Sequence, residues 1–213
     1  MKAANEISAS VIGRLPRYYR FLCELRNDGI VRISSSELSK RMGFTASQIR
    51  QDFNCFGGFG QQGYGYHVRQ LREGIASVLG MDRRMTAVVV GAGNLGRAII
   101  SNFSFRDCGF ELAAAFDTAE AIIGTEIAGV RVLPAEELGT FIRAHEVDIA
   151  VLTVPQRYAE ETAELVAASG VRGIWNFTGM DFDISREDVN VENVHFSDSL
   201  LTMGYYLRGR IGE

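Results

Sequence analysis

Cysteine, proline and lysine are all scarce in this chain of 213 residues, and each shortage excludes something. The three cysteines are widely spaced and form no CxxC pair, so we expect neither a disulfide framework nor a metal site. Three prolines leave no proline-rich linker. The only lysines are Lys2 and Lys40, which excludes a Tyr-x-x-x-Lys dyad or a lysine general acid from Thr86 onward.

Long apolar runs are also absent. No run approaches the roughly 18 residues that a membrane span needs, and the N-terminus lacks the apolar core of a signal peptide. We therefore expect a cytoplasmic protein with no membrane partner. Apolar residues make up 46% of the chain and charged residues 23%, which is typical of a globular protein with one large domain or two small ones.

The net charge of −4 conceals an uneven distribution. Residues 1–85 contain 13 Lys or Arg against 7 Asp or Glu, a net of +6, whereas residues 86–213 contain 9 against 19, a net of −10. A basic first part is the electrostatic pattern expected of a DNA-binding domain. Two domains with unremarkable surfaces would give the same asymmetry, so charge alone leaves both possibilities open.

Two helix-start signals lie close together in the basic part. Ser34-Ser-Ser-Glu37 fits a capping box for a helix through Leu38 to Met42, and Gly43 is expected to end that helix. Thr45-Ala-Ser-Gln48 is a second capping box and opens a helix that continues through Phe53. This arrangement predicts a helix-turn-helix.

Glycine and aromatic residues alternate just after this second helix. Five glycines fall within 55–66, a pattern that suits a twisted two-stranded ribbon. A ribbon directly after a recognition helix is the wing of a winged-helix domain. Amphipathic helices are also predicted from Pro16 to Asn27 and over 68–80.

From Thr86 the chain alternates apolar strands and helices, which predicts an α/β fold with a mostly parallel sheet covered on both faces. The expected strands are 87–90, 111–116, 149–154 and 173–176, and the expected helices include 95–103, 158–168 and an apolar tail over 199–207. We expect a winged-helix domain over 1–80, a Rossmann-type domain over 81–198 and a C-terminal dimerisation helix over 199–213.

A glycine-rich turn directly follows the first of these strands. GxGxxG alone is weak evidence, but here it lies between apolar β-formers and a plausible helix. The first glycine allows a tight turn, the second lets the backbone approach a pyrophosphate, and the third lets strand and helix pack closely. Free N–H groups at the helix start then face the phosphates. The candidate cofactor residues are Gly91, Ala92, Gly93, Asn94, Leu95 and Gly96.

Asp117 stands at the end of the next strand, 21 residues after Gly96. A carboxylate at this place accepts hydrogen bonds from ribose hydroxyls. Neither Arg nor Lys follows it, and Glu120 adds a second acid, so NAD(H) is favoured over NADP(H). A Rossmann-type domain without a ligand is the alternative. Thr153, Pro155 and Asn176 follow later strands and could border a nicotinamide, or could be ordinary strand-to-loop residues.

The predicted recognition helix carries side chains that can read bases. Its early residues would lie nearest the base edges in the major groove, where Gln pairs with adenine and Arg with guanine. Ile49 and Phe53 are expected to face the core instead. The candidate DNA-binding residues are Thr45, Ser47, Gln48, Arg50 and Gln51 in this helix, Gly60, Gly63 and Tyr64 in the wing, and Arg17, Arg41 and Arg69 for phosphates.

An NAD-dependent oxidoreductase with an accessory helical domain is the alternative function. His195, near Asp198, is the only histidine close to a plausible cofactor pocket, and His145 lies in a polar stretch. The chain contains no P-loop, HExxH or GxSxG motif. We therefore expect a sensor without catalytic residues, although a single histidine acting as general acid or base stays open.

Taken together, the motifs resemble the redox-sensing transcriptional repressor Rex family over nearly the whole chain. The resemblance rests on Arg14–Arg20, Ser34–Leu38, Ala46–Phe53, Phe56–Gly60, Gly63–Tyr66, Gly91–Gly96, Leu152–Pro155 and Glu192–Val194. It implies a homodimer on a palindromic operator, with a C-terminal helix exchanged between protomers. It also implies repression of fermentation and respiration genes when NADH is low, and release of operator DNA when NADH binds.

The sequence departs from the family at the switch. Many members carry a Tyr after the glycine turn and an Asp before a pocket Phe, and both exchange contacts with an Arg of the DNA-binding domain. An ungapped alignment places Asn102 and His195 at the first two positions, Phe196 at the pocket Phe and Arg20 at the Arg. We hypothesise that His195 and Arg20 communicate differently here, giving a weaker or pH-sensitive coupling.

Overall fold

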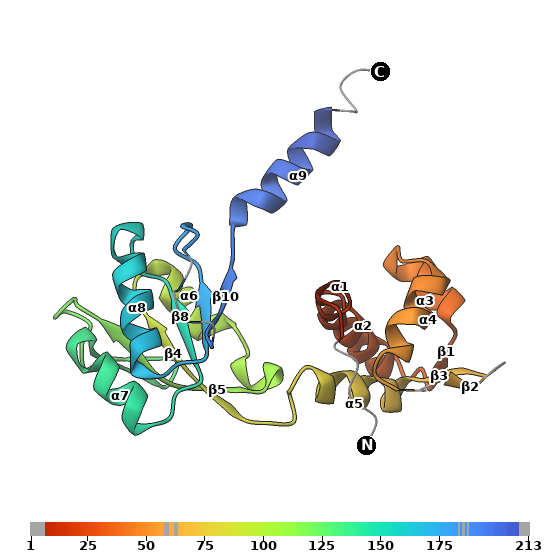
Figure 1. The fold of residues 1–213 in the computed structure, drawn as a ribbon, viewed down its shortest axis with the longest axis horizontal. Coiled ribbons are helices and arrows are strands. Elements are labelled where there is room, and N and C mark those ends of the chain that lie inside the picture. The colour runs from red at the N-terminus through yellow and green to blue at the C-terminus, as the bar shows by residue number, and fades with distance from the viewer. Residues whose placement is uncertain are drawn as a thin grey trace. The chain divides into compact units, whose positions relative to one another are not determined.

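The computed structural model describes residues 7–57, 60–61, 64–182, 184, 186 and 188–208. The chain divides into two compact units, Met1–Arg83 and Arg84–Glu213, and each is described by itself (Figure 1). The first unit ends after the expected boundary at residue 80, because the turn that follows its last helix is hydrogen-bonded back to that helix, from Met81 N–H to Ala76 O.

The first unit is helical with a small sheet. Its strands pair antiparallel in the order β1-β3-β2, so the expected wing has a third strand. A strand of two residues shows no hydrophobic period, which is why the sequence did not reveal it. The elements are α1 (Ala9–Ile12), α2 (Leu15–Asn27), β1 (Arg32–Ile33), α3 (Ser35–Met42), α4 (Ala46–Asn54), β2 (Gly60–Gln61), β3 (Gly65–His67) and α5 (Val68–Val78).

One hydrophobic core joins the helices of this unit. Its fully buried side chains come from α2, α3, α4 and α5, and include Tyr18, Leu22, Leu38, Ile49, Phe53, Leu71 and Ile75. Ile49 and Phe53 thus face the core, as their helical spacing predicted. The remaining faces of α4 are free to project side chains outward.

A buried polar cluster fixes α4 against α2. Asp52 is 2% exposed and accepts two hydrogen bonds from the Arg14 guanidinium, at 2.7 and 2.8 Å. The Tyr18 hydroxyl donates a third, at 2.8 Å. Burial raises the pKa of Tyr18, so its hydroxyl remains a donor. Because a buried carboxylate needs partners of this kind, Asp52 holds α4 in one position.

The second unit is built on a mostly parallel sheet, which confirms the α/β prediction. Within the described residues the strand order is β10-β9-β8-β4-β5-β7-β6, and only the edge strand β6 is antiparallel. The strands are β4 (Met85–Val90), β5 (Phe110–Asp117), β6 (Glu126–Ile127), β7 (Val130–Pro134), β8 (Ile149–Leu152), β9 (Gly173–Asn176) and β10 (Asn190–Asn193).

Helices cover the two faces of this sheet unequally. One face packs against α7 (Leu138–Ala144) and α8 (Ala159–Ser169). The other packs against α6 (Asn94–Asn102) and the short 3-10 helix η1 (Phe105–Cys108). Two further 3-10 turns, η2 (Ala135–Glu137) and η3 (Gln156–Tyr158), precede α7 and α8.

The C-terminal helix α9 (Phe196–Arg208) begins before the expected start at Ser199. It belongs to the second unit and has no buried residue in the single chain, so the dimerisation helix expected over 199–213 stays a prediction. Its large apolar side chains are half to three-quarters exposed, namely Leu200, Leu201, Met203, Tyr205, Tyr206 and Leu207. Among the described residues, no helix is long and apolar enough to cross a membrane.

Candidate nucleotide and DNA sites

The order of the parallel strands defines where a ligand would bind in the second unit. β4 and β8 are neighbours at the centre of the sheet. The chain continues from β4 to β5 on one side and from β8 to β9 on the other, so the two connections run in opposite directions. In open α/β sheets, ligands bind at the carboxyl ends of the strands at this switch point. The glycine turn follows β4 and Thr153 follows β8, so both lie at that point.

Two of the three glycines in the turn are required by the chain itself. Gly91 has φ +96°, and a Cβ there would lie 2.9 Å from the Thr153 backbone. A Cβ on Gly96 would overlap the Gly91 carbonyl oxygen and lie 2.9 Å from Thr153 Oγ1. These two residues allow β4, α6 and the end of β8 to pack closely.

Gly93 is different, because nothing in the chain requires a glycine there. Its φ is −70°, which any residue can adopt, and no atom lies within 4 Å of the position of a Cβ. The residue is exposed and is the N-cap of α6. The helix leaves the first-turn N–H groups of Asn94, Leu95 and Gly96 without intrahelical partners. The turn is therefore open on the side that a phosphate would approach.

Asp117 lies at the end of β5, directly beside this turn. Its Oδ2 accepts the Ala92 N–H at 2.6 Å, and its Oδ1 accepts the Ala119 N–H at 2.9 Å. Ala92 is buried, so this bond fixes the carboxylate against the glycine turn. A carboxylate oxygen can accept more than one bond, and the side chain is only half-buried. Asp117 can therefore also accept hydroxyl groups of a ligand.

The residues expected to border a nicotinamide have different environments. Thr153 donates its hydroxyl to Gly91 O at 2.6 Å and thereby ties β8 to the glycine turn. β8 ends at Leu152 rather than at 154 as predicted. Pro155 is exposed at the start of the next turn.

Asn176 is 1% exposed, and the chain itself uses all its side-chain hydrogen bonds. It donates to Met180 O and Asn193 Oδ1, both at 2.7 Å, and accepts from the N–H and hydroxyl of Thr178. The side-chain amide is thus fully paired within the chain, since an amide has two donors and two acceptor positions. Asn176 shapes the loop that follows β9, and its place beside a cofactor stays a prediction.

A run of aromatic rings leads from the start of α9 along the sheet. Phe196 is 63% exposed, and its ring centroid is 6.0 Å from that of Phe177. Phe177 contacts Trp175 at 4.6 Å, and Trp175 contacts Phe103 at 5.1 Å. Two of these rings, Phe103 and Trp175, line an apolar cavity of about 490 Å³ on the α6 side of the sheet, together with Phe105, Ile149 and Val191.

The expected switch residues lie in both units. His195 Nε2 is 2.7 Å from Asp181 Oδ1, and this pairing raises the pKa of His195, with Asp198 adding to the effect. Asn102 donates its amide to Ala98 O within α6. Arg20 is exposed on α2 in the first unit. The described partner of His195 is thus an acid of its own unit, which the sequence alone did not indicate.

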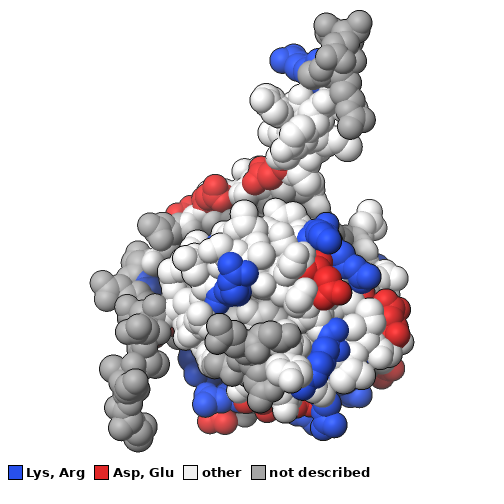
Figure 2. All heavy atoms as spheres, turned by 90° about the vertical axis from the view of Figure 1, so that its right-hand side faces the viewer, with Lys and Arg blue, Asp and Glu red and all other residues white. Residues whose placement is uncertain are grey.

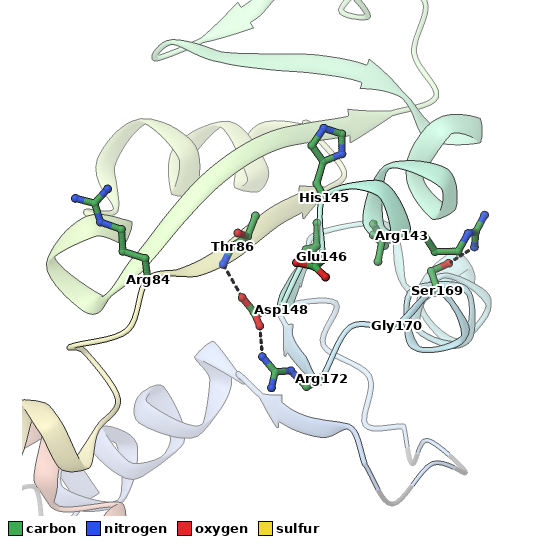
Figure 3. A pocket seen from close by; sticks show the side chains of 11 residues that line it. Arg84, Thr86, Arg143, His145, Glu146, Asp148, Ser169, Gly170 and Arg172 are labelled. Carbon is green, nitrogen blue, oxygen red and sulfur yellow. Dashed lines mark hydrogen bonds and ion pairs between the residues drawn. The ribbon is translucent and has the colours of Figure 1, made fainter.

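A second cavity, of about 640 Å³ and lined by polar residues, lies at the amino ends of the strands (Figure 3). Asp148 accepts the Thr86 N–H at 2.8 Å and pairs with Arg172, while Arg143 lies 3.4 Å from Ser169 Oγ. His145 stacks on Phe141, with ring centroids 3.8 Å apart. These contacts tie β4, β8 and the ends of α7 and α8 together, at the edge opposite the switch point, so we assign this cavity a structural role.

The capping box predicted for the recognition helix α4 consists of two hydrogen bonds, and one of them is present. Thr45 Oγ1 accepts the Gln48 N–H at 3.1 Å, whereas the reciprocal bond from Gln48 is not among the described contacts. In α3 both bonds of the Ser34–Glu37 capping box are present, and Gly43 ends that helix with φ 73°. The helix-turn-helix therefore has the predicted form.

The candidate DNA-reading side chains lie on the outer faces of α4. Thr45, Ser47, Arg50 and Gln51 are exposed and Gln48 is half-buried. Arg50 reaches back to Ser35 Oγ at 3.1 Å, which orients its guanidinium along the helix pair. In the wing, Gly60 lies in β2 and Tyr64 is 70% exposed, while Gly63 lies outside the described residues.

Basic side chains surround the helix-turn-helix. Arg17 donates to Met42 O at 3.1 Å and stacks on Phe44, and Arg41 lies over Phe21. Arg69 forms an exposed ion pair with Glu73. Figure 2, which views the molecule from the right-hand side of Figure 1, shows Lys and Arg side chains distributed over the visible face. Among the described residues, no cluster of His, Cys, Asp or Glu could hold a metal ion.

Comparisons with known proteins match both units. Residues 6–54 match the family described as "Putative DNA-binding protein N-terminus", and residues 82–180 match the family described as "CoA binding domain". Two proteins named redox-sensing transcriptional repressor Rex, from Caldicellulosiruptor saccharolyticus and Clostridium botulinum, are each 47% identical. The alignments cover 98% and 97% of this chain, and 95% and 98% of the relatives.

Solved structures agree with these relatives. A crystal structure of RSP in complex with β-NAD+ and operator DNA has a TM-score of 0.90 and 46% identity, and the match covers 97% of this chain and 94% of that one. A structure of RSP in complex with β-NADH has a TM-score of 0.89 and 43% identity, with 97% and 96% covered. RSP is described as a Rex-family repressor.

These similarities extend over both units and decide between the two functions that the sequence left open. A transcriptional repressor is supported, and an oxidoreductase is not. The chain belongs to the Rex family of redox-sensing transcriptional repressors.

Proposed function

We propose that this protein binds palindromic operator DNA as a homodimer and releases it when NADH binds to the second unit. The observation that carries the nucleotide part is the contrast within the glycine turn. Gly91 and Gly96 are required by the packing of the chain, whereas Gly93 is exposed and free of neighbours. A glycine that the protein does not need for itself fits a place where a pyrophosphate approaches the backbone.

Asp117 supports NAD(H) as the ligand. Its carboxylate is held beside the turn by Ala92 N–H, and the following residues provide no Arg or Lys. A 2′-phosphate would meet acids rather than a counter-charge, so NADP(H) is disfavoured. The proposed cofactor contacts are the backbone of Gly91–Gly96, Asp117, Thr153, Pro155 and Phe196, and Asn176 acts through the loop it shapes.

The proposed DNA contacts follow from the exposed side of the helix-turn-helix. The capped α4 would lie in the major groove, with Ser47, Gln48 and Arg50 near the bases. The resemblance to RSP, which was crystallised with operator DNA, supports this assignment. Arg17 and Arg41 would bind phosphates, contributing affinity without reading sequence. Action on DNA and NAD(H) fits a cytoplasmic protein.

The second copy is supported by α9. Six large apolar side chains exposed on one helix exceed what a free chain end leaves in water. Exchange of α9 between protomers would bury them and, together with the uncovered sheet face beside Trp175, provide the dimer surface. Asp substitutions at Leu201 and Tyr205 should then give monomers in analytical ultracentrifugation. Dimers that persist in this variant would contradict the exchange.

Release of DNA needs two states of the dimer with different spacing of the recognition helices. NADH must bind the state that cannot fit both half-sites more tightly, because equal affinity for both states shifts nothing. A tenfold loss of operator affinity needs about 1.4 kcal/mol of differential binding. An apolar pocket around Phe196 would favour the neutral reduced nicotinamide, because removing the cationic oxidised ring from water costs more.

The test is a titration of a labelled palindromic promoter fragment with the full-length protein, followed by fluorescence anisotropy at several NADH/NAD+ ratios. We expect operator binding that is lost as the NADH fraction rises. NADPH and coenzyme A serve as control nucleotides and should have little effect. Binding that is indifferent to both NADH and NAD+ would overturn the proposal.

A further inference from the structure

The loop after β9 is held at two points, one on each side. On the inner side, buried Asn176 binds Met180 O and the Thr178 backbone, and Phe177 N–H donates to Leu152 O. On the outer side, Asp181 is bound by His195 at 2.7 Å. The first contact is buried within the sheet edge, whereas the second is an exposed side-chain bridge to the residue just before α9, beyond the β9–β10 pairing and the bond from Asn176 to Asn193.

The outer contact lies directly before the pocket phenylalanine. His195 precedes Phe196, the first residue of α9, and Asp181 lies in the loop that begins with Phe177. The rings of Phe196 and Phe177 have centroids 6.0 Å apart. Asp181 and Phe177 of the loop thus contact His195 and Phe196, respectively, and these four residues form a small ring of contacts.

This ring of contacts lies at the same edge of the sheet as the glycine turn. Because β4, β8, β9 and β10 are parallel, their carboxyl ends share one edge. β8 separates β9 from β4, and strands are spaced about 4.8 Å apart, so the loop begins about 10 Å from the end of β4. That separation suits the two ends of a dinucleotide, with its pyrophosphate at the turn and its nicotinamide toward Phe196.

We propose that the Asp181–His195 ion pair positions Phe196 against Phe177 at the nicotinamide end of the site, so that deprotonation of His195 weakens NADH binding. This inference rests on the proposed function. It assigns His195 a positioning role through Asp181, a contact that the second unit makes on its own, and the hypothesis that His195 and Arg20 communicate differently stays a prediction.

The charges around His195 set the direction of the pH effect. Among the described residues, the charged groups that act on it are Asp181 from the loop and Asp198 from the first turn of α9, and both raise its pKa above the ordinary value of about 6.5. The ion pair is therefore complete below that value and is lost as the pH rises through the raised pKa. His195 is three-quarters buried at its side chain, whereas Asp181 is 73% exposed, so the effect should be modest.

Two substitutions separate the hydrogen bond from the charge. In His195→Gln the amide can still donate to Asp181 but does not titrate. In Asp181→Asn the negative partner is removed. Asp188→Asn is the matched control, because it makes the same change at an exposed aspartate of the same unit whose ion pair is with Arg186.

The first measurement needs no cofactor. The chain has three histidines, so the imidazole signal of His195 is identified in an NMR titration as the one missing from His195→Gln. We expect its pKa to fall in Asp181→Asn and to stay at the wild-type value in Asp188→Asn. An unchanged pKa in Asp181→Asn would overturn the inference.

The second measurement follows NADH binding through the single tryptophan, Trp175, whose ring lies 4.6 Å from Phe177. We expect wild-type NADH affinity to fall about two- to fivefold between pH 6 and pH 8.5, the range of an exposed ion pair. His195→Gln should show no such fall, and Asp181→Asn should be weaker at pH 6. Equal pH profiles in the wild type and His195→Gln would overturn the inference but leave the proposed function intact. Failure of the wild type to bind NADH at any pH would overturn both.

Discussion

The two units present their ligand-facing groups in different ways. In the first unit these groups are side chains on a capped helix, and the position of the helix depends on the buried cluster around Asp52. In the second unit the backbone of the glycine turn faces the ligand, and its shape depends on close packing of Gly91 and Gly96 with Thr153. Removal of a hydrogen-bonding partner should therefore destabilise the first unit most, whereas addition of a side chain at the glycine turn should affect the second unit most.

The largest effect is expected from Asp52→Ala. Removal of one partner of a buried ion pair costs 3–5 kcal/mol in other proteins, and we expect about 3 kcal/mol here, because Arg14 is one-fifth exposed. Urea unfolding should show this loss in the first unit, together with loss of operator binding, while NADH binding is retained. Glu73→Ala, which breaks an exposed pair with Arg69, is the control. If both variants were equally stable, Asp52 would not be what fixes α4.

The next largest effect is expected from Gly96→Ala, because its Cβ would overlap the Gly91 carbonyl oxygen. Overpacking of this kind costs about 1–3 kcal/mol. We expect the free energy of unfolding to fall by this amount and NADH binding to be abolished, as measured by calorimetry. A stable variant with normal NADH affinity would show that the turn tolerates side chains and would remove the contrast between the two units.

Gly93→Ala sharpens the same comparison. Its Cβ meets no atom of the chain, so stability should change by less than about 0.5 kcal/mol. NADH affinity should nevertheless fall at least about tenfold, because the methyl group occupies the side from which the pyrophosphate approaches. Thermal unfolding and an NADH titration of the same sample measure the two quantities. Loss of stability without loss of affinity would mean that Gly93 serves the fold rather than the ligand.

In the first unit, Arg50→Ala and Arg17→Ala should separate recognition of the base sequence from binding to the phosphates. We expect Arg50→Ala to lose about tenfold in operator affinity but little on scrambled DNA, since a base contact is worth about 1–3 kcal/mol. Arg17→Ala should weaken binding to both DNAs and reduce the slope of log affinity against log salt by about 1. Anisotropy titrations at several salt concentrations distinguish these results. Identical losses on both DNAs for both variants would argue against base reading by Arg50.

The smallest effect is expected from Thr45→Ala, which removes the side-chain cap of α4. Such a cap is worth about 1 kcal/mol, so urea unfolding should show a decrease of this size and operator binding should weaken slightly. Thr45→Ser keeps the acceptor oxygen and should behave as wild type. A loss in Thr45→Ser as large as in Thr45→Ala would assign the effect to the methyl group instead.

Local signals made much of this structure predictable. Capping residues and Gly43 set the helix-turn-helix, because a cap satisfies N–H groups only a few residues away. The prediction of β9 has the observed bounds, whereas the strand over 149–154 ends early at Leu152. No local pattern predicted β1, β6, β7, β10 or α7, since most of these are short and the strands depend on neighbours far along the chain for their hydrogen bonds.

The sequence by itself determined the spacing of the glycines, the place of Asp117 and the caps around α4, because each depends on backbone geometry over a few residues. Only the tertiary structure decided which groups are still available to a ligand. It uses the amide of Asn176 inside the chain, leaves Gly93 open and brings Asp181 to His195. These outcomes depend on which strand ends meet at one edge of the sheet, and no local pattern of residues encodes that meeting.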